Sequence, residues 1–419
     1  PVEISGTSKD FPDLPLTAAG IQKIELMLKD LNNNYYWNGS TWVTSGSDLY
    51  FDIGDNSANW NYSVPSPTNT WTDGHSYNIK PKITDYAGNY AYGTLTNFTY
   101  DISTPTAYIE YPVDEGYYPS GYPDVINGTG YDYSPGVGIQ EVKITIQRES
   151  DKSWWDGSSW QGELSGPYWL DANYNGALNQ WSTSTLTTWS DGIKYTIKAR
   201  ALDKAGNLQT DFPVAISSNT FTVDWTKPAA AVTSPDTDVN YFPDIQGTAS
   251  DTSPGEVKEV YVRIWRQDNM YYDESQNDWF SDEYWNLATG TTDWIYSKPT
   301  IWANEITYKV TAKSQDKAGN WSLLSSSVTF IVDLSSPISG VSVPVNNSYY
   351  RTLSQIQGTT TDNESGGGSG VLVNTNVRIQ IYDVSGDKYW RGSVNDWQTV
   401  IDTRPATSFT SGNPNTWAY

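Results

Sequence analysis

The sequence predicts an all-β chain of tandem β-sandwich domains that together form an elongated rod. Two observations lead to this fold class. Four sequence elements recur in the same order along the 419 residues, and runs of alternating apolar and polar residues lie between them, separated by turn residues. The length suits several domains of ordinary size. Because the chain contains 20 Trp and 31 Tyr, a few large side chains can fill the core of each domain, and we expect folded domains, not disorder.

Three of the recurring elements contain an Asp at a fixed place, and the fourth is a hairpin rich in Trp and Tyr. The motif D-x-A-G-N begins at Asp85, Asp203 and Asp316. A D-x-x-x-P junction begins at Asp101, Asp224 and Asp333. The motif I-x-G-T-x-x-D ends at Asp10, Asp132, Asp251 and Asp362. The aromatic hairpins cover residues 35–42, 153–160, 271–279 and 389–397.

These elements divide the chain into four repeats, which we place at residues 1–104, 105–227, 228–336 and 337–419. Repeat 1 is expected to lack its first strand, and repeat 4 is expected to stop before a D-x-A-G-N motif. Both ends of the sequence are therefore expected to cut through a domain of a longer protein.

Within each repeat the pattern indicates short strands. Alternating runs at residues 21–29, 142–147, 257–265 and 377–382 favour strands with one buried face. Asn38-Gly39 and Asp156-Gly157 predict type I′ hairpin turns between aromatic strands. About seven short strands per repeat, with turn residues between them, predict an immunoglobulin-like sandwich.

The order of I-x-G-T-x-x-D, D-x-A-G-N and D-x-x-x-P resembles the bacterial immunoglobulin-like repeats of large cell-surface proteins and adhesins. The resemblance covers the whole chain, and it implies tandem domains on a cell surface, often with calcium at the domain junctions. The chain departs from that pattern in its long aromatic hairpin, and in Trp302-Ala303-Asn304-Glu305 where other repeats have Asp-Gly.

The repeated Asp residues predict calcium sites. In such a sandwich, the junction Asp, the Asp after I-x-G-T and the Asp of D-x-A-G-N lie at the same end of a domain. Carboxylates that converge repel one another unless a cation lies between them, and Ca²⁺ accepts six to eight oxygen ligands in loose geometry. The predicted groups are Asp101 with Asp132 and Asp203, Asp224 with Asp251 and Asp316, Asp333 with Asp362, and Asp10 with Asp85. The alternative is that each Asp only braces a turn.

The aromatic hairpins allow two interpretations. They hold up a long hairpin through cross-strand pairs, or they form faces that contact glycans or partner chains. The candidate contact residues are Trp37, Trp42, Trp154, Trp155, Trp160, Trp169, Trp390 and Trp397.

Composition narrows the function. The chain has no Cys and one His, which excludes disulfides and argues against His- or Cys-based catalysis. Its net charge of −23 disfavours nucleic acid, and no apolar run is long enough to span a membrane. Acidic pairs such as Asp282 and Glu283 are a weak catalytic signal. We expect a non-enzymatic, secreted or cell-surface stalk or filament that contacts neighbouring domains or copies; glycan-binding modules and accessory modules of a secreted enzyme remain the alternatives.

Overall fold

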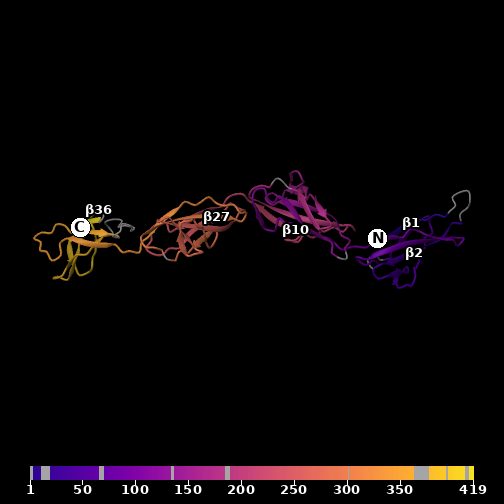
Figure 1. Ribbon diagram of the computed structural model, residues 1–419, viewed down its shortest axis with the longest axis horizontal. Coiled ribbons are helices and arrows are strands. Elements are labelled where there is room, and N and C mark those ends of the chain that lie inside the picture. Colours follow the sequence, from indigo (N-terminus) through magenta and orange to yellow (C-terminus); the bar gives the residue numbers. More distant parts are fainter. Residues whose placement is uncertain are drawn as a thin grey trace. The chain divides into compact units, whose positions relative to one another are not determined.

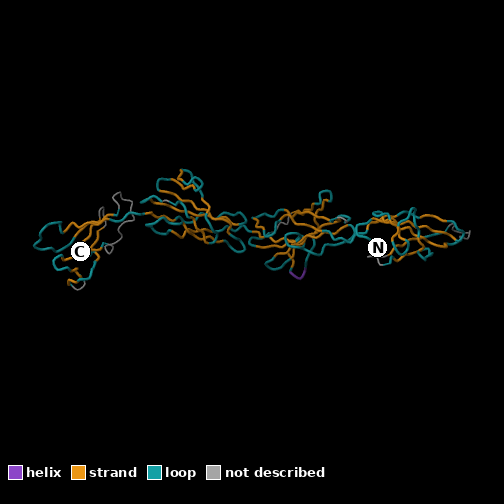
Figure 2. Tube along the Cα trace, turned by 90° about the horizontal axis from the view of Figure 1, so that it is seen from below, coloured by secondary structure: helices purple, strands orange, loops and turns teal. Residues whose placement is uncertain are grey.

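The structure is a computed structural model that describes residues 3–10, 19–65, 70–133, 136–184, 189–300, 302–362, 377–392, 395–410 and 415–419. Strands make up nearly all of the regular structure in these ranges, and η1 (Glu163–Ser165) is a short 3-10 turn (Figures 1 and 2). No helix in this part of the chain is long and apolar enough to cross a membrane. The predicted all-β class of tandem sandwiches is confirmed.

The chain forms two compact units, Pro1–Asp224 and Trp225–Tyr419, and each is described by itself. In the first part of unit 1, β1 pairs with β6, and a second sheet has the order β4-β3-β2-β7-β8, with β5 on β2 and β9 on β7. The predicted strand at residues 21–29 is present as β2. The strands here are β1 (Glu3–Thr7), β2 (Ile21–Asp30), β3 (Tyr35–Trp37), β4 (Trp42–Val43), β5 (Phe51–Asp52), β6 (Asn59–Ser63), β7 (Ser76–Asp85), β8 (Tyr90–Tyr92) and β9 (Thr96–Thr99).

The second part of unit 1 shows the sandwich topology most fully. One sheet has the order β10-β12-β17-β16 and the other has the order β13-β18-β19-β11, with β14 on β13 and β15 on β14. Strand β16 pairs with β13 through its first residues and with β17 through its last, and β11 runs parallel to β19. The strands are β10 (Thr106–Tyr111), β11 (Gly116–Tyr118), β12 (Val125–Tyr131), β13 (Ile139–Arg148), β14 (Trp154–Trp155), β15 (Trp160–Gln161), β16 (Leu170–Asn175), β17 (Gln180–Ser184), β18 (Ile193–Asp203) and β19 (Ser218–Val223).

The first half of unit 2 repeats the pairing orders β10-β12-β17 and β13-β18-β19. The sheets β20-β21-β26 and β24-β23-β22-β27-β28, with β25 on β22, are followed by β29-β30-β37-β36, β31-β35 and β32-β33-β34. The strands are β20 (Ala229–Ser234), β21 (Ile245–Ser250), β22 (Val257–Arg266), β23 (Met270–Asp273), β24 (Asp278–Phe280), β25 (Asn286–Leu287), β26 (Asp293–Tyr296), β27 (Ile306–Asp316), β28 (Val328–Val332), β29 (Ile338–Val343), β30 (Gln357–Thr361), β31 (Arg378–Ile379), β32 (Tyr382–Asp383), β33 (Lys388–Arg391), β34 (Asp396–Gln398), β35 (Arg404–Pro405), β36 (Ser408–Thr410) and β37 (Asn415–Ala418).

Four buried cores accompany the four stretches of sequence. Their buried members lie within residues 4–77, 107–223, 245–332 and 377–417. Each core therefore draws its residues from one predicted repeat, while the boundaries of the repeats remain predictions.

Each of the first three cores contains a buried tyrosine whose hydroxyl group binds the backbone of the preceding turn. The hydroxyl oxygens of Tyr77, Tyr195 and Tyr308 accept hydrogen bonds from backbone N–H groups five residues upstream, at 2.8, 2.9 and 2.8 Å. This is the tyrosine-corner arrangement of immunoglobulin-like sandwiches. Two of these tyrosines, Tyr77 and Tyr195, end the motif W-x-D-G-x-x-Y. The motif is therefore a structural element that fixes the start of the long strands β7 and β18.

The third repeat keeps the same turn without its glycine. Gly74, Gly192 and Glu305 have φ values of 74°, 66° and 64°. All three donate their backbone N–H to a carbonyl near the end of the last strand of the repeat, namely Tyr100, Val223 and Val332. Glu305 thus adopts a backbone conformation that favours glycine.

The predicted type I′ turns are wrong. Trp37 pairs with Trp42 and Trp155 pairs with Trp160, so each hairpin has a four-residue loop. Gly39 and Gly157 have positive φ, but a type I′ turn requires a second residue with positive φ, and Asn38 and Asp156 do not have one. Instead, the Asn38 Oδ1 atom accepts hydrogen bonds from the backbone N–H groups of Ser40 and Thr41.

The glycine of I-x-G-T lies beneath a tryptophan of the neighbouring strand. The cross-strand pairs are Gly6 with Trp60, Gly128 with Trp181, Gly247 with Trp294 and Gly358 with Trp417. A Cβ on Gly128 would lie 2.8 Å from Cζ2 of Trp181, and it would also meet the carbonyl of Tyr108. The motif is therefore a packing requirement, because only glycine leaves room for the buried indole.

We expect Gly128→Ala to destabilise unit 1 by about 1–3 kcal/mol, the usual cost of overpacking. Gly162→Ala is the matched control in the same repeat, because a Cβ there would meet nothing within 4 Å. Its effect should stay within about 0.5 kcal/mol. Chemical denaturation of the whole chain measures both, and equal unfolding midpoints for the two variants would refute the packing role.

Candidate metal centre

The structure brings together the first predicted group of carboxylates. Asp101, Asp132 and Asp203 each present one oxygen, and these three atoms lie within 4.8 Å of one another. Asp101 follows β9 at the end of repeat 1. In the next repeat, Asp132 directly follows β12 and Asp203 is the last residue of β18. The group therefore joins the linker to two loops of the following domain.

Asp101 is 7% exposed and is fixed by backbone donors from both sides. Its Oδ1 atom accepts a hydrogen bond from the N–H of Ser103 at 2.9 Å, and its Oδ2 atom accepts one from Val137 at 2.9 Å. The bond from Ser103 lies within the linker and fixes its conformation. The bond from Val137 connects the linker to repeat 2.

Asp132 carries the least compensated charge of the group. Its Oδ2 atom accepts a hydrogen bond from the N–H of Gly138 at 2.7 Å, whereas its buried Oδ1 atom has no hydrogen-bond partner among the described residues. Burial raises the pKa of Asp132, and the carboxylates of Asp101 and Asp203 raise it further against the opposing effect of the Gly138 bond. A Cβ on Gly136 would collide with this carboxylate, so the loop must approach it without a side chain.

Asp203 is fully buried and braces the D-x-A-G-N turn. Its Oδ1 atom accepts hydrogen bonds from the N–H groups of Ala205 and Asn207, both at 2.8 Å, and its Oδ2 atom accepts one from Nδ2 of Asn207 at 2.8 Å. Asn207 also donates to the backbone carbonyl of Asp101 at 3.1 Å. The turn therefore orients one carboxylate and holds the end of the preceding repeat.

This arrangement suits a hard divalent cation. Within the described residues, no Lys, Arg or His forms an ion pair with any of the three carboxylates. Burial and the neighbouring carboxylates of Asp101 and Asp203 disfavour the charged form of Asp132, and a cation with oxygen ligands would remove that repulsion.

The other predicted Asp residues keep parts of this geometry. Asp85 and Asp316 accept hydrogen bonds from the backbone and the side chain of Asn89 and Asn320, as Asp203 does from Asn207. Asp10 accepts a bond from the N–H of Gly20 at 2.8 Å, as Asp132 does from Gly138. Asp85 and Asp10 therefore occupy the corresponding turns of repeat 1.

The remaining four Asp residues are described within their own units. Asp224 is buried at the end of unit 1. In unit 2, Asp251 accepts a bond from the N–H of Thr252, the buried Asp333 accepts one from Ser335 at 3.0 Å, and Asp362 follows β30. Because the predicted group of Asp224, Asp251 and Asp316 includes residues of both units, it stays a prediction, as does the pair of Asp333 and Asp362.

Sequence reasoning missed a second brace at the first junction. Asp73, from the W-x-D-G turn, accepts hydrogen bonds from the N–H of Ile102 at 2.8 Å and from Oγ of Ser103 at 2.7 Å. Burial acts to raise the pKa of Asp73, but these bonds hold it below its usual value. In repeat 3, Asn304 and Glu305 accept the corresponding bonds from Leu334 and Ser335. The only signal in the sequence was that this turn recurs at the same place in the repeats. The turn comes next to the linker only in the folded chain, so its contact with the linker could not be read from the sequence.

Four of the eight candidate aromatic residues pack in or against the cores of the domains. Trp37 and Trp155 are buried, and Trp42 and Trp160 lie against Tyr77 and Tyr195 with ring centroids 5.6 and 5.5 Å apart. These rings support the hairpin, and Trp37 and Trp155 have almost no surface to offer a ligand.

The other four candidates are not part of these cores. Trp154 is half-buried and donates its indole N–H to the carbonyl of Glu163. The guanidinium carbon of Arg200 lies over the ring of Trp169, 4.0 Å from the ring centroid. Trp390 and the exposed Trp397 line a pocket of about 450 Å³ in repeat 4.

Comparison with known proteins finds solved structures of low similarity to this chain. No family model and no curated protein matches the sequence. Fibronectin(III)-like modules of Clostridium thermocellum CbhA match at 16% identity, over 54% of this chain and 94% of theirs, with a TM-score of 0.27. The FN1–FN3 domains of chicken CNTN1 match at 11% identity, over 79% and 94%, with a TM-score of 0.26. A structure of a 1.5-MDa bacterial ice-binding adhesin matches at 13% identity, over 79% and 90%, with a TM-score of 0.30.

The raised pKa of Asp132 predicts how the metal-free protein responds to pH. A carboxyl whose folded pKa exceeds its unfolded value of 3.8 destabilises the fold above the folded pKa, and this penalty disappears as the pH falls toward 3.8. In a chelator at neutral pH, Asp132→Asn should therefore melt at a higher temperature than the wild type, and the difference should shrink in acid. Melting temperatures followed by circular dichroism across pH measure this.

Asp124→Asn is the control for this comparison, because Asp124 is exposed in the same repeat. It should leave the melting temperature nearly unchanged at every pH. A lower melting temperature for Asp132→Asn in the chelator at neutral pH would contradict the assigned repulsion.

Proposed function

We propose that this chain is a non-catalytic structural and adhesive segment of a secreted or cell-surface protein, stiffened by calcium ions at the junctions between its repeats. The observation that carries the proposal is the convergence of Asp101, Asp132 and Asp203 at the first junction. A domain needs no such group for its own core, since two of these residues belong to one repeat and the third to the linker before it.

Calcium fits this group better than other common ions. Three carboxylates supply hard oxygen ligands from flexible loops, and Ca²⁺ tolerates loose geometry, with waters or carbonyl oxygens completing its shell. Mg²⁺ prefers a tight octahedron with several retained waters. The chain has no Cys and a single His, so a Zn²⁺ site of the usual nitrogen and sulfur ligands cannot form here.

The mechanical effect follows from where the ligands lie. The linker is already held to repeat 2 by the bond from Val137 to Asp101 and the bond from Asn207 to the Asp101 carbonyl. An ion bound by the three carboxylates would add a further link between the linker and repeat 2. It would also remove the repulsion among the carboxylates, which opposes these hydrogen bonds. Pro105 limits rotation of the same linker. Together they would convert a hinge into a stiff joint.

The repeated sequence extends the proposal along the chain. Asp224, Asp251 and Asp316 occupy the same motif positions at the second junction, and Asp333 and Asp362 occupy two of them at the third. Asp10 and Asp85 would serve repeat 1 in the same way. A row of such joints suits a stalk or filament, whose neighbouring domains or copies are its main partners.

This function predicts that calcium restricts motion between repeats 1 and 2. Because the chain has no Cys, Asn97→Cys and Glu163→Cys place a spin label in each of these two repeats without background labelling. Both positions are exposed. The distance distribution between the labels, measured by pulsed electron resonance, should narrow when calcium replaces a chelator.

The same labels on the Asp132→Asn chain are the control, and their distribution should stay broad with calcium. Magnesium should narrow the wild-type distribution less than calcium does. Equal widths with and without calcium in the wild type would refute the stiffening role, even if the ion binds.

A further inference from the structure

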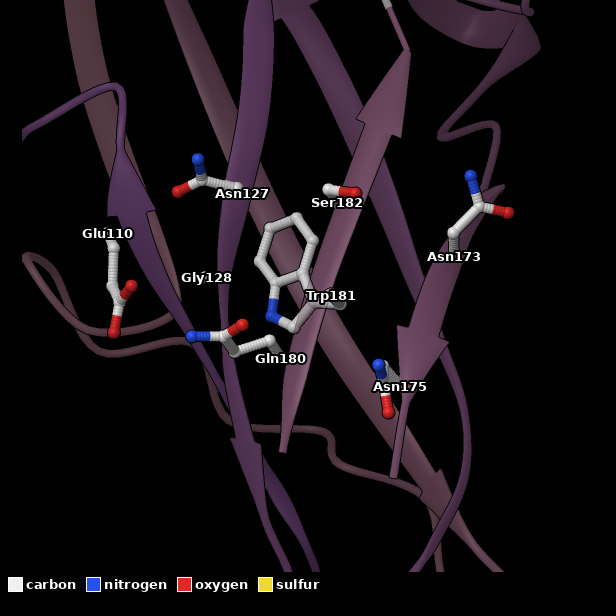
Figure 3. A pocket seen from close by; sticks show the side chains of 8 residues that line it. All are labelled: Glu110, Asn127, Gly128, Asn173, Asn175, Gln180, Trp181 and Ser182. Atoms are coloured by element: carbon white, nitrogen blue, oxygen red, sulfur yellow. The ribbon is translucent and has the colours of Figure 1, made fainter. Parts of the chain in front are cut away.

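The outer face of one sheet in repeat 2 carries a polar pocket that lies apart from the carboxylate group. It has a volume of about 330 Å³, at the small end of the ~300–1,000 Å³ typical of small-molecule sites. Figure 3 shows the ring of Trp181 in the middle, with Glu110 on one side and Asn173 and Asn175 on the other. The lining comes from all four strands of the sheet β10-β12-β17-β16.

The strand register produces this lining. Asn127 of β12 pairs with Ser182 of β17, which pairs with Asn173 of β16, and Gln180 pairs with Asn175 one step along. A register shift between Ile109 and Tyr111 leaves Glu110 as the extra residue of β10, beside this row. The bulge therefore brings one carboxylate to a row of amides and a hydroxyl.

The polar groups of the pocket are available for a ligand. The side chains of Glu110, Asn127, Asn173, Gln180 and Ser182 make no hydrogen bond or ion pair with the described residues. Amides donate and accept, the hydroxyl does both, and the carboxylate accepts from two neighbouring donors. No cationic side chain lines the pocket, which argues against an anion, and a single carboxylate is too few for a metal ion.

The same pocket recurs in repeat 4, with a volume of about 360 Å³. The register shift between Val341 and Val343 places Ser342 where repeat 2 has Glu110, and Gln357 takes the place of Asn127. Ser408, Thr410 and Thr416 take the places of Asn173, Asn175 and Gln180. These five replacements keep a side chain that can form hydrogen bonds. The place of Ser182, however, is taken by Ala418, whose methyl side chain cannot.

Repeat 3 differs at the centre of the row. Its tryptophan, Trp294, pairs with Gly247, and Ile295 pairs with Gln246, so Ile295 stands where repeat 2 has Ser182. An isoleucine at this position is therefore compatible with the fold.

We propose that the pocket in repeat 2, and its counterpart in repeat 4, each bind one neutral sugar unit of a glycan. A pyranose offers several hydroxyl groups that both donate and accept, without charge, and its size suits the volume. The binding would let a structural segment also hold a carbohydrate surface. The proposal does not depend on the carboxylate group, because none of Asp101, Asp132 and Asp203 lines the pocket.

The test uses the whole chain and four neutral probes, the tetrasaccharides of glucose, galactose, mannose and N-acetylglucosamine. Isothermal titration calorimetry, in calcium and in a chelator, should find at least one probe that binds two per chain. Ser182→Ile, which copies repeat 3, should reduce the number to one. Asn173→Ala should weaken the repeat 2 site by about tenfold, since it removes both hydrogen-bonding atoms of one amide.

Asn97→Ala is the matched control, because it removes an exposed amide from β9 in repeat 1. It should leave binding unchanged, and thermal melting should show that all variants fold. The proposal is overturned if no probe binds with a Kd below ~1 mM. It is equally overturned if a folded Ser182→Ile chain binds as many sugars as the wild type, since that would place the contact elsewhere, for instance on the tryptophan pocket of repeat 4.

Discussion

The junction between repeats 1 and 2 depends on how the repulsion among its three carboxylates is offset. Two unit charges 4 Å apart repel by about 4 kcal/mol at an effective dielectric constant of about 20. Backbone donors from Ser103, Val137 and Gly138 and the braced turn at Asp203 offset part of this cost. The hydrogen bonds of Asp203 alone would fit a simple turn brace, but the buried Oδ1 atom of Asp132 would not. The proposed cation would account for the positions of all three side chains.

Much of this architecture could be predicted from the sequence, because it follows from local rules. Alternating apolar residues located β2, and the recurrence of one motif order indicated tandem domains. The positions of Asp101, Asp132 and Asp203 could be grouped because an immunoglobulin-like topology brings particular loops to one end of a domain, and the structure places these three together. That inference needed only the fold class and the motif order.

What could not be predicted depends on pairing across strands. The glycine of I-x-G-T is needed because Trp181 covers Gly128 from a strand more than fifty residues away, and no local rule identifies that partner. The polar pocket arises from a bulge at Glu110 together with the register of three other strands. From the sequence, the hairpin tryptophans could equally contact a ligand or pack against the core. Their contacts with Tyr77 and Tyr195, which become visible only in the structure, show that they pack against the core.

The central claim is that the carboxylate group at the first junction holds one calcium ion. Isothermal titration of calcium into the whole chain tests it most directly, with Asp132→Asn as the matched variant and Asp124→Asn as its control. The account predicts that Asp132→Asn binds one calcium ion fewer per chain than the wild type and that Asp124→Asn binds the same number. Equal numbers for the wild type and Asp132→Asn would contradict it, and the carboxylates would then have to be explained as braces of the turns alone.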